Sequence, residues 1–393
     1  MVSVRSTALE SAPPIVHVVA RYPPALGGME TAVHAIAREQ HDEGMQVRVI
    51  TTSQGQHDAR LVYDGFPVAR LKSFVAANTP IAPALLFRLL GLKKQSIVHL
   101  HIAQAYTPEL VWLASILRHT KYVAHFHADV IPSGRAGLIL EPYKSVVLSR
   151  VMRGAAKVLV PTDDYKDLVC DKYKLSRDRV AVVDNGSSHQ IMDQPKFFSE
   201  AKARLLFVGR LAIQKNVPLL LQAVAAYRDK YGKDFQLTIV GDGDLRPQIE
   251  SEIRRLELGS HVDLVGPRYG AALESTYEQS DLLLLTSVFE SFGLVLVEGM
   301  AKALPIVSVQ IPAVRNVVLD EVNGLLVDST PAALADAINR LLSDRDLYAK
   351  VSINNLSSAR RYTWESVVSK ISVAYDSLKL SAASGVGPGR IEV

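Results

Sequence analysis

The sequence predicts an α/β protein with two doubly wound, Rossmann-like domains, each built on a parallel sheet. Its 393 residues exceed what one hydrophobic core usually serves, and a hydrophobic content of 48% is enough for two cores. Short apolar runs also alternate with segments of helical periodicity, in two successive series. Strand alternating with helix is typical of a parallel sheet covered by helices on both faces.

The first series of elements ends near residue 186. Apolar runs typical of strands occupy residues 15–20, 47–52, 96–102, 121–130, 155–162 and 180–186. Helical periodicity follows the first run at residues 29–44, where Gly44 closes the helix, and the third run at residues 107–119. These connections predict the first parallel sheet.

The second series repeats the same alternation. Its strand-like runs occupy residues 204–210, 236–243, 262–267, 281–287, 305–310 and 324–328. Helix-like segments lie between them at residues 216–232, 245–259 and 294–303, and a last helix is expected at residues 364–380. This series predicts a second parallel sheet.

The domain boundaries follow from this order. We expect a first domain at residues 1–188, a linker of mixed polarity at 189–200 and a second domain at 201–363. The helix at 364–380 should pack back on the first domain, and the Gly/Ser/Pro-rich tail at 381–393 should be disordered. Ligands of such sheets bind at the carboxyl ends of the strands, which predicts a cleft between the two domains.

Composition narrows the class of protein. A net charge of +4, with 21% charged residues, argues against general disorder and against a strong nucleic-acid binder. The single cysteine, Cys170, excludes an internal disulfide and fits a reducing compartment. Neither a run of 18 apolar residues nor a signal-peptide pattern is present, so we expect a cytoplasmic protein, soluble or peripheral on the inner membrane face.

Positive charge gathers in one part of the first domain. Residues 80–157 hold ten Lys and Arg against three Asp and Glu. Within them, residues 83–95 are apolar with a basic end, which is typical of a helix packed on its sheet and also of a helix lying on anionic lipid. Peripheral membrane contact therefore stays open as an alternative.

Two cations follow the first strand of the second series. Arg210 and Lys215 lie in the loop between that strand and its helix. Arginine as a planar fork and lysine as a point charge suit a diphosphate at a strand's carboxyl end. An ordinary solvated loop with surface charges is the alternative for this segment taken alone.

Two glutamates flank the start of a later helix. Glu290 follows the run DLLLLTS, and Glu298 lies about a turn and a half into the helix LVLVEGMAKA. The free N–H groups at the helix start favour an anion, so Glu290 could accept hydrogen bonds from a sugar attached to that anion, and Glu298 from a ribose. The alternatives are a helix-start carboxylate for Glu290 and a surface carboxylate for Glu298, although the apolar neighbours of Glu298 argue against exposure.

Histidines alternate along two strands of the first domain. His125 and His127 are two residues apart on one strand and so point the same way, as do His99 and His101 on another. Paired histidines can ligate zinc, and a buried core histidine is the other interpretation. For His99 and His101 we expect a structural role. Asp129 could orient His127, contact an acceptor or be a plain loop residue.

These motifs together resemble the retaining glycosyltransferases of the GT-B fold, in particular glycosyltransferase family 4. The resemblance covers nearly the whole chain and rests on segments that occur in the family's order: ALGGME at 25–30, HFHADV at 125–130, VDNG at 183–186, GRLAIQKNV at 209–217, VGDGDLRPQIE at 240–250, the E-x7-E pair Glu290 and Glu298, and VNGLLV at 322–327. Two stretches depart from the family's pattern. QIPAVRNVV stands where many members carry a Gly-Gly pair followed by Glu, and Ser187-Ser188-His189 replaces a hydrophobic residue and Asp.

The resemblance implies a role for each matching residue. Arg210 and Lys215 would bind the donor diphosphate, Glu290 the hydroxyls of the transferred sugar and Glu298 the ribose. His127 would face the donor sugar near its anomeric carbon. The enzyme would use no metal and no cofactor. Further donor contacts would come from Gly27, Gly28, Gly266, Arg268, Phe292, Gly293 and Leu294. The first domain would then be the acceptor side, and the second would bind the donor nucleotide sugar.

We therefore expect a retaining, metal-independent hexosyltransferase that moves a sugar from a nucleoside diphosphate, UDP or GDP, to a small-molecule, glycan or lipid-linked acceptor. A glycoside hydrolase would need two carboxylates flanking one bond, whereas Glu290 is assigned to the transferred sugar and Glu298 to the ribose. A nicotinamide-dependent dehydrogenase would need a G-x-G-x-x-G that the chain lacks after its first strand. A sugar-nucleotide epimerase of the same fold and a non-catalytic nucleotide-sugar-binding protein stay open as alternatives.

Overall fold

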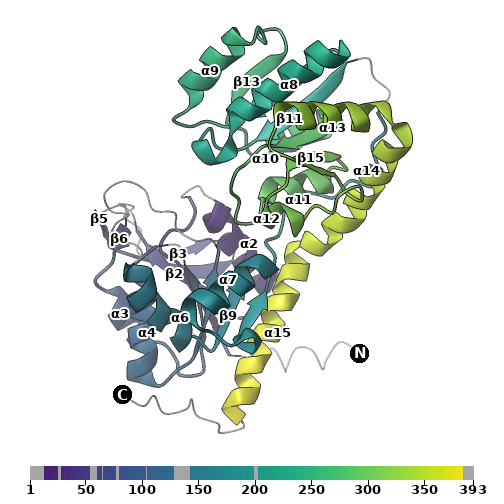
Figure 1. Ribbon diagram of the computed structural model, residues 1–393. Helices are drawn as coiled ribbons and strands as arrows, with labels where there is room; N and C mark the ends of the chain where they lie inside the picture. The colour runs from purple at the N-terminus through teal and green to yellow at the C-terminus, as the bar shows by residue number, and fades with distance from the viewer. Residues whose placement is uncertain are drawn as a thin grey trace. The chain divides into compact units, whose positions relative to one another are not determined.

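The chain forms two compact α/β units in the computed structural model (Figure 1). The structure describes residues 13–24, 28–53, 60–63, 65–76, 79–102, 104–127, 142–198 and 202–383. Unit 1 contains the residues up to Asn185 together with those from Trp364 onward, and unit 2 contains Gly186–Thr363. The final helix of the chain therefore belongs to the first unit.

Unit 1 is built on a sheet of eight strands within the described ranges. In sheet order they are β10 (Val180–Val182), β9 (Lys157–Val160), β8 (Tyr122–Phe126), β7 (Ile97–Ile102), β1 (Ile15–Val18), β2 (Val47–Thr52), β4 (Phe66–Leu71) and β3 (Arg60–Tyr63). All neighbours pair in parallel except β3 and β4, which are antiparallel. A separate antiparallel pair is formed by β5 (Phe74–Ala76) and β6 (Thr79–Ile81).

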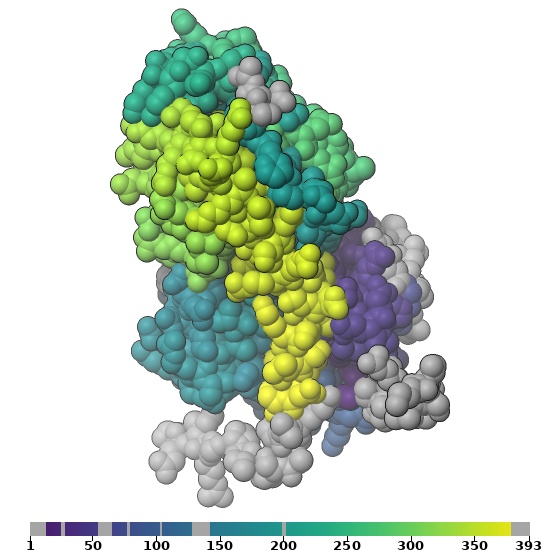
Figure 2. Space-filling model, turned by 90° about the vertical axis from the view of Figure 1, so that its right-hand side faces the viewer, coloured from purple at the N-terminus to yellow at the C-terminus, as the bar shows by residue number. Residues whose placement is uncertain are grey.

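Helices cover both faces of this sheet. One face packs against α2 (Gly28–Asp42) and α15 (Trp364–Ala383), and the other against α3 (Leu85–Leu90), α4 (Thr107–Arg118), α6 (Ser149–Gly154) and α7 (Asp163–Tyr173). Strand alternation explains the division, because Val16 and Leu100 face the second group while Ile15 and Ile97 face the first. Helix α15 lies along the surface of unit 1 as the yellow helix of Figure 2. Over the described residues, we find no helix that combines the length and apolarity needed to span a bilayer.

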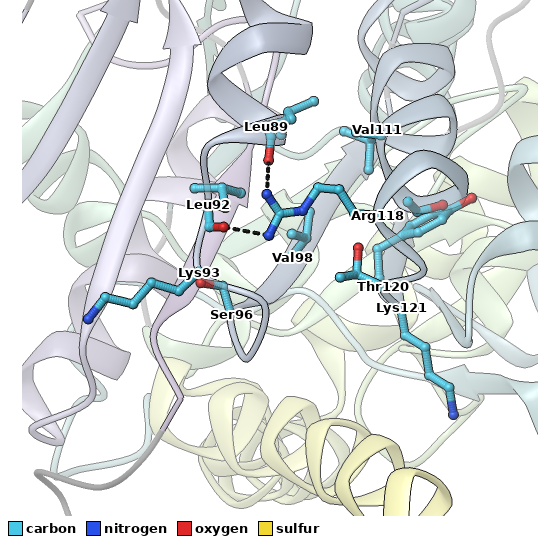
Figure 3. Close-up of a pocket in the computed structure, with 12 residues that line it drawn as sticks. Leu89, Leu92, Lys93, Ser96, Val98, Val111, Arg118, Thr120 and Lys121 are labelled. Carbon is cyan, nitrogen blue, oxygen red and sulfur yellow. Dashed lines mark hydrogen bonds between the residues drawn. The ribbon is translucent and has the colours of Figure 1, made fainter. Parts of the chain in front are cut away.

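A shallow pocket opens where strands β7 and β8 of unit 1 begin (Figure 3). Arg118 closes one side of it by donating to the main-chain carbonyl oxygens of Leu89, Leu90 and Leu92. Parallel strands of one sheet bind ligands at their carboxyl ends, whereas this pocket lies at the amino ends. The arginine therefore caps the end of α3 and gives no indication of a ligand site.

Unit 2 is built on a wholly parallel sheet of six strands. In sheet order they are β13 (Val262–Gly266), β12 (Phe235–Val240), β11 (Ala203–Val208), β14 (Leu282–Leu285), β15 (Ile306–Val309) and β16 (Leu325–Val327). Its helices are α8 (Val217–Tyr231), α9 (Arg246–Arg255), α10 (Gly270–Gln279), α11 (Leu294–Ala301), α12 (Pro312–Arg315), α13 (Pro331–Ser343) and α14 (Arg345–Ala359). The order reverses at β11, which pairs with β12 on one side and β14 on the other.

The apolar runs of the sequence correspond to the parallel strands of both units, and several other elements had no such signal. Strands β3, β4, β5 and β6, at residues 60–81, were not predicted, and neither were α6, α7, α10, α12, α13 and α14. Residues 189–198, expected as a linker, are tied to unit 2: Ile191 packs on its core, and Lys196 Nζ donates to the carbonyl oxygens of Glu278 and Ser280. Helix α15 ends at Ala383, three residues beyond the predicted end.

Candidate active site

Lys215 and Glu290 form an ion pair at the point where the strand order of unit 2 reverses. Lys215 Nζ lies 2.5 Å from Glu290 Oε1, and the two side chains are only 19% and 11% exposed. Ser287 Oγ donates to the same carboxylate oxygen over 2.6 Å. Lys215 follows β11 and Glu290 follows β14, and these strands are neighbours. The sequence placed both residues at strand ends, and the structure brings them into direct contact.

The two loops that carry this pair are joined by further hydrogen bonds. Thr286 Oγ1 donates to the carbonyl oxygens of Lys215 and Asn216 over 3.0 and 3.1 Å. The amide of Val288 donates to the carbonyl oxygen of Gln214 over 2.9 Å. Because both loops are held at several points, the ammonium and the carboxylate are fixed relative to each other without a ligand.

Helix α11 begins directly after Glu290. Gly293 stands before its first residue with a φ of +89°, a conformation that favours glycine. Phe292 is buried in the core of unit 2, with its ring packed edge-on against Tyr362, so only its main chain is available for a ligand. Leu294 is partly buried and starts the helix. The predicted amides therefore lie at a helix N-terminus.

A close approach of two loops shapes the end of β11. A Cβ at Gly241 would lie 1.9 Å from the carbonyl oxygen of Gly209, and one at Gly243 would lie 2.4 Å from that of Leu211. Only glycine permits this approach. Arg210 lies between the two contacts and is exposed, as a side chain that binds a soluble anion must be.

Glu298 is a partly buried side chain with two neighbours that the sequence did not identify. Its side chain is 20% exposed, Tyr277 donates its hydroxyl to Oε2 over 2.6 Å, and His189 Nε2 lies 3.8 Å from Oε1. Burial, and then the charge of Glu298, raise the pKa of Tyr277 far above its usual value, so the phenol keeps its proton. The interpretation of Glu298 as a plain surface carboxylate is therefore wrong.

His189 also contacts a second carboxylate. Its Nδ1 lies 2.9 Å from Glu274, which in turn pairs with Lys302, a lysine that is only 2% exposed. His189, Glu274 and Lys302 thus form a polar network that reaches Glu298 through His189. The stretch Ser187-Ser188-His189, which departs from the family's pattern, thus supplies a partner of the residue expected to bind ribose.

Gly266 and Arg268, expected to contact the donor, lie at and just after the end of β13. Gly266 has a φ of +73° and accepts a hydrogen bond from the amide of Gly241 over 2.9 Å. Arg268 donates to Thr276 Oγ1 over 2.6 Å, so its guanidinium is already engaged within unit 2. The stretch QIPAVRNVV contributes the short helix α12.

Only some of the site residues predicted in unit 1 lie within the described residues. His127 follows β8 and is buried, and burial lowers its pKa to about 4 although a hydrogen bond with the side chain of Asn185 opposes that shift. Its Nε2 lies 2.9 Å from Nδ1 of His101. Gly28 begins α2 and is exposed. Gly27 and Asp129 lie outside the described residues.

Comparison with known protein families gives a glycosyltransferase description for each of the two units. The family description "Glycosyl transferase 4-like domain" matches residues 27–186, and "Glycosyl transferases group 1" matches residues 189–357. The chain is 27% identical to phosphatidyl-myo-inositol mannosyltransferase of Mycobacterium leprae, over 91% of this chain and 95% of the relative. It is 24% identical to GDP-mannose:cellobiosyl-diphosphopolyprenol alpha-mannosyltransferase of Komagataeibacter xylinus, over 92% of each chain.

The fold is also that of solved structures. The structure of Anabaena Alr3699/HepE in complex with UDP and glucose superposes with a TM-score of 0.73, at 19% identity, over 93% of this chain and 100% of that chain. At this identity the likeness concerns the fold. With both family descriptions matched in order and two parallel α/β units, this chain belongs to the GT-B glycosyltransferases of group 1, family 4.

Proposed function

We propose that this glycosyltransferase transfers a hexose, with retention and without a metal ion, from a nucleoside-diphosphate sugar to an acceptor hydroxyl. The observation that carries the proposal is the contact of Lys215 with Glu290 at the reversal of strand order in unit 2. A cation and a hydrogen-bond acceptor fixed side by side match a donor whose diphosphate is joined directly to its sugar.

The diphosphate would be bound by positive groups on two loops. Lys215 and Arg210 follow β11, and the amides of Phe292, Gly293 and Leu294 begin α11. Negative charge develops on the diphosphate as the glycosidic bond breaks, and donors already in place stabilise that charge without reorganisation. This supply of positive charge is our reason for proposing a reaction that needs no metal ion.

The two carboxylates would position the donor. In this proposal Glu290 accepts hydrogen bonds from hydroxyls of the transferred sugar while Lys215 contacts the adjacent phosphate. Glu298, held by Tyr277 and His189, accepts from the ribose. The loop after β13, with Gly266 and Arg268, would hold the base.

Retention is proposed to follow from attack on the face that the diphosphate leaves. The departing phosphate oxygen takes the acceptor's proton, so the new glycosidic bond forms on that same face. No carboxylate nucleophile is needed, and Glu290, the carboxylate beside the sugar in this proposal, is already engaged with Lys215 and Ser287. His127 of unit 1, neutral at physiological pH because burial lowers its pKa, would face the donor sugar.

UDP and GDP are the proposed nucleotides. The Anabaena structure holds UDP and glucose, and the Komagataeibacter relative is named for GDP-mannose. The names of the relatives include a lipid-linked saccharide and a phosphatidylinositol as acceptors, which supports a lipid-linked acceptor here, with a small molecule or glycan as further candidates. Peripheral membrane contact would then run through α3, whose Phe87 is 76% exposed close to Lys93 and Lys94 in the sequence.

The test is the stereochemistry and metal dependence of turnover. Purified protein is incubated with UDP- and GDP-hexoses and with phosphatidylinositol or polyprenyl-diphosphate saccharide acceptors, with EDTA present. Release of the nucleoside diphosphate is recorded, and the anomeric configuration of the product is read by NMR. We expect acceptor-dependent release and an α-product from an α-linked donor. Turnover that needs added metal, an inverted product, or epimerisation of the donor without acceptor would contradict the proposal.

A further inference from the structure

Five histidines are buried together within unit 1. His17 lies on β1, His99 and His101 on β7, and His125 and His127 at the end of β8. These three strands are neighbours, and alternation places all five rings on the sheet face covered by α2 and α15. Only His127 has a role in the proposed function, so the other four need an explanation.

One branch of hydrogen bonds leads from His127 to helix α2. His127 Nε2 lies 2.9 Å from Nδ1 of His101, whose Nε2 lies 2.9 Å from Nδ1 of His17. His17 Nε2 lies 2.8 Å from the side-chain oxygen of Gln40. The four side chains form an unbroken series across three neighbouring strands and a helix.

A second branch leads from Gln40 back to the sheet. The amide nitrogen of Gln40 donates to the hydroxyl of Tyr375, on α15, over 3.3 Å. That hydroxyl lies 2.5 Å from Nδ1 of His99, whose Nε2 lies 3.2 Å from Nδ1 of His125. The series ends at His125 Nε2, which is buried and has no hydrogen-bond partner among the described residues.

The chemistry of neutral imidazole then fixes each tautomer. Burial lowers the pKa of all five histidines, to about 4 for His17 and His127 and well below the usual value for His99, His101 and His125. Each neutral ring has one N–H and one lone pair. Because the oxygen of Gln40 can only accept, His17 carries its proton on Nε2 and has a lone pair on Nδ1. His101 must therefore donate from Nε2 to Nδ1 of His17, which leaves a lone pair on its own Nδ1. His127 in turn donates from Nε2 to Nδ1 of His101.

The second branch has the same polarity. The amide nitrogen of Gln40 donates to the Tyr375 oxygen, which leaves the hydroxyl proton of Tyr375 to be donated to Nδ1 of His99. His99 then donates from Nε2 to His125. With this polarity all five rings are Nε2–H tautomers, and Nδ1 of His127 is the hydrogen-bond acceptor on the side of Asn185.

A metal site is the competing explanation. His17, His99 and His101, and likewise His101, His125 and His127, have ring nitrogens within 4.8 Å of one another. However, successive rings are stacked or tilted at only 16° to 34°, which places their lone pairs side by side instead of directing them at one point. Nine of the ten ring nitrogens also have a hydrogen-bonding partner, counting Asn185 for His127. Hydrogen bonding accounts for the arrangement better than a metal.

We propose that Gln40 is a positioning residue, which acts through His17 and His101 to hold His127 as the Nε2–H tautomer with Nδ1 available as an acceptor. An amide is suited to this position because it accepts from His17 and donates to Tyr375 at the same time. The catalytic consequence rests on the proposed function, in which His127 faces the donor sugar. There a sugar hydroxyl would take the place of Asn185 as the hydrogen-bond partner of Nδ1.

The test is ¹⁵N NMR of the histidine side chains in the full-length protein, together with steady-state kinetics. Gln40→Met keeps the length of the side chain but removes both polar groups. We expect a single Nε2–H tautomer at His127 in the wild type and a mixture of tautomers in the variant. The kcat should fall roughly 10- to 100-fold, the loss seen when a partner that orients a functional histidine is removed. The KM for the donor should stay unchanged.

The matched control is Tyr122→Phe, which removes another buried hydroxyl of unit 1, one that donates to the carbonyl oxygen of Val151. It should lower stability without changing the His127 tautomer or kcat. If Gln40→Met does not fold, His17→Phe breaks the same branch, and both tautomers are expected at His127.

Two results would overturn the inference. One is an unchanged tautomer at His127 in Gln40→Met, or in His17→Phe when that variant stands in for it. The other is stoichiometric zinc or copper in the purified wild type, found by elemental analysis. A wild type that binds no nucleotide would refute the proposed function instead, because the tautomers are measured without donor.

Discussion

Lys215→Met is the variant that separates the proposed site from ordinary surface charge. The Nζ of Lys215 lies 2.5 Å from a carboxylate oxygen of Glu290, and both side chains are mostly buried. A hydrogen bond to a charged group contributes about 1.5–3 kcal/mol, and we take the lower end because both groups keep some contact with water. For a unit of this size, a loss of ~1.5 kcal/mol lowers the unfolding midpoint by roughly 3–6 °C.

The effect on turnover should be much larger than the effect on stability. Removing one group that stabilises developing charge commonly costs about 10²- to 10³-fold in kcat. Differential scanning fluorimetry measures the first quantity, and release of the nucleoside diphosphate measures the second. Lys230→Met is the matched control, since Lys230 pairs with Asp336 over 2.7 Å in the same unit but both side chains are more than half exposed. If Lys215→Met loses no more kcat than Lys230→Met, Lys215 does not stabilise the leaving group.

Three further predictions concern a hydrogen bond of Glu298, the burial of two histidines and the close approach at Gly241. Tyr277→Phe removes the hydroxyl that donates to Glu298, so the KM for the donor should rise several-fold while kcat changes little; an unchanged KM would remove Glu298 from the ribose site. Burial lowers the pKa of His17 and His127 from 6.5 to about 4, so between these two pH values the unfolded chain binds more protons than the folded one. The free energy of unfolding should therefore fall as the pH falls from 6.5 to about 4, by at most about 1.4 kcal/mol per pH unit for each histidine. Urea unfolding at about pH 7.5 and pH 5 checks this, and equal midpoints would contradict it. Gly241→Ala would place a Cβ 1.9 Å from a carbonyl oxygen, so it should separate the two loops at the end of β11 and abolish nucleotide binding; wild-type binding in a calorimetric titration would contradict this.

The fold of both units was predictable where strands are buried on both faces. Residues 282–285 are continuously apolar, and residues 306–309 are apolar except for Ser308, because helices cover both sides of the sheet; their burial is therefore visible in the sequence. The strands at residues 66–71 and 74–76 are partly or wholly exposed and carry no such run. Helix α14 buries Ser352 and Asn355 as well as apolar residues, which weakens its periodicity.

The site was predictable in its residues but not in its contacts. Arg210, Lys215, Glu290 and Glu298 were found because strand ends and helix starts can be read locally. The pairing of Lys215 with Glu290 depends on β11 and β14 being neighbours, which is a property of strand order and not of either segment.

The same limit applies to the histidines of unit 1. Their spacing of two predicts that each pair shares a face, but only the order β8-β7-β1 brings the pairs together. Contacts across the sheet also explain why His99 and His101, expected to be structural, prove to be hydrogen-bonded neighbours of other histidines.

Nucleotide binding by the wild type and Glu290→Ala tests the central claim most directly. The measurement is a thermal-shift series with UDP, GDP, dTDP and ADP and with their sugars. One diphosphate should stabilise both proteins, because Lys215, Arg210 and the start of α11 are intact in both. Its sugar should add further stabilisation in the wild type alone, since only there can Glu290 accept from the sugar hydroxyls. If no diphosphate or nucleotide sugar stabilises the wild type at millimolar concentration, the assignment of this site to a nucleoside-diphosphate sugar is wrong.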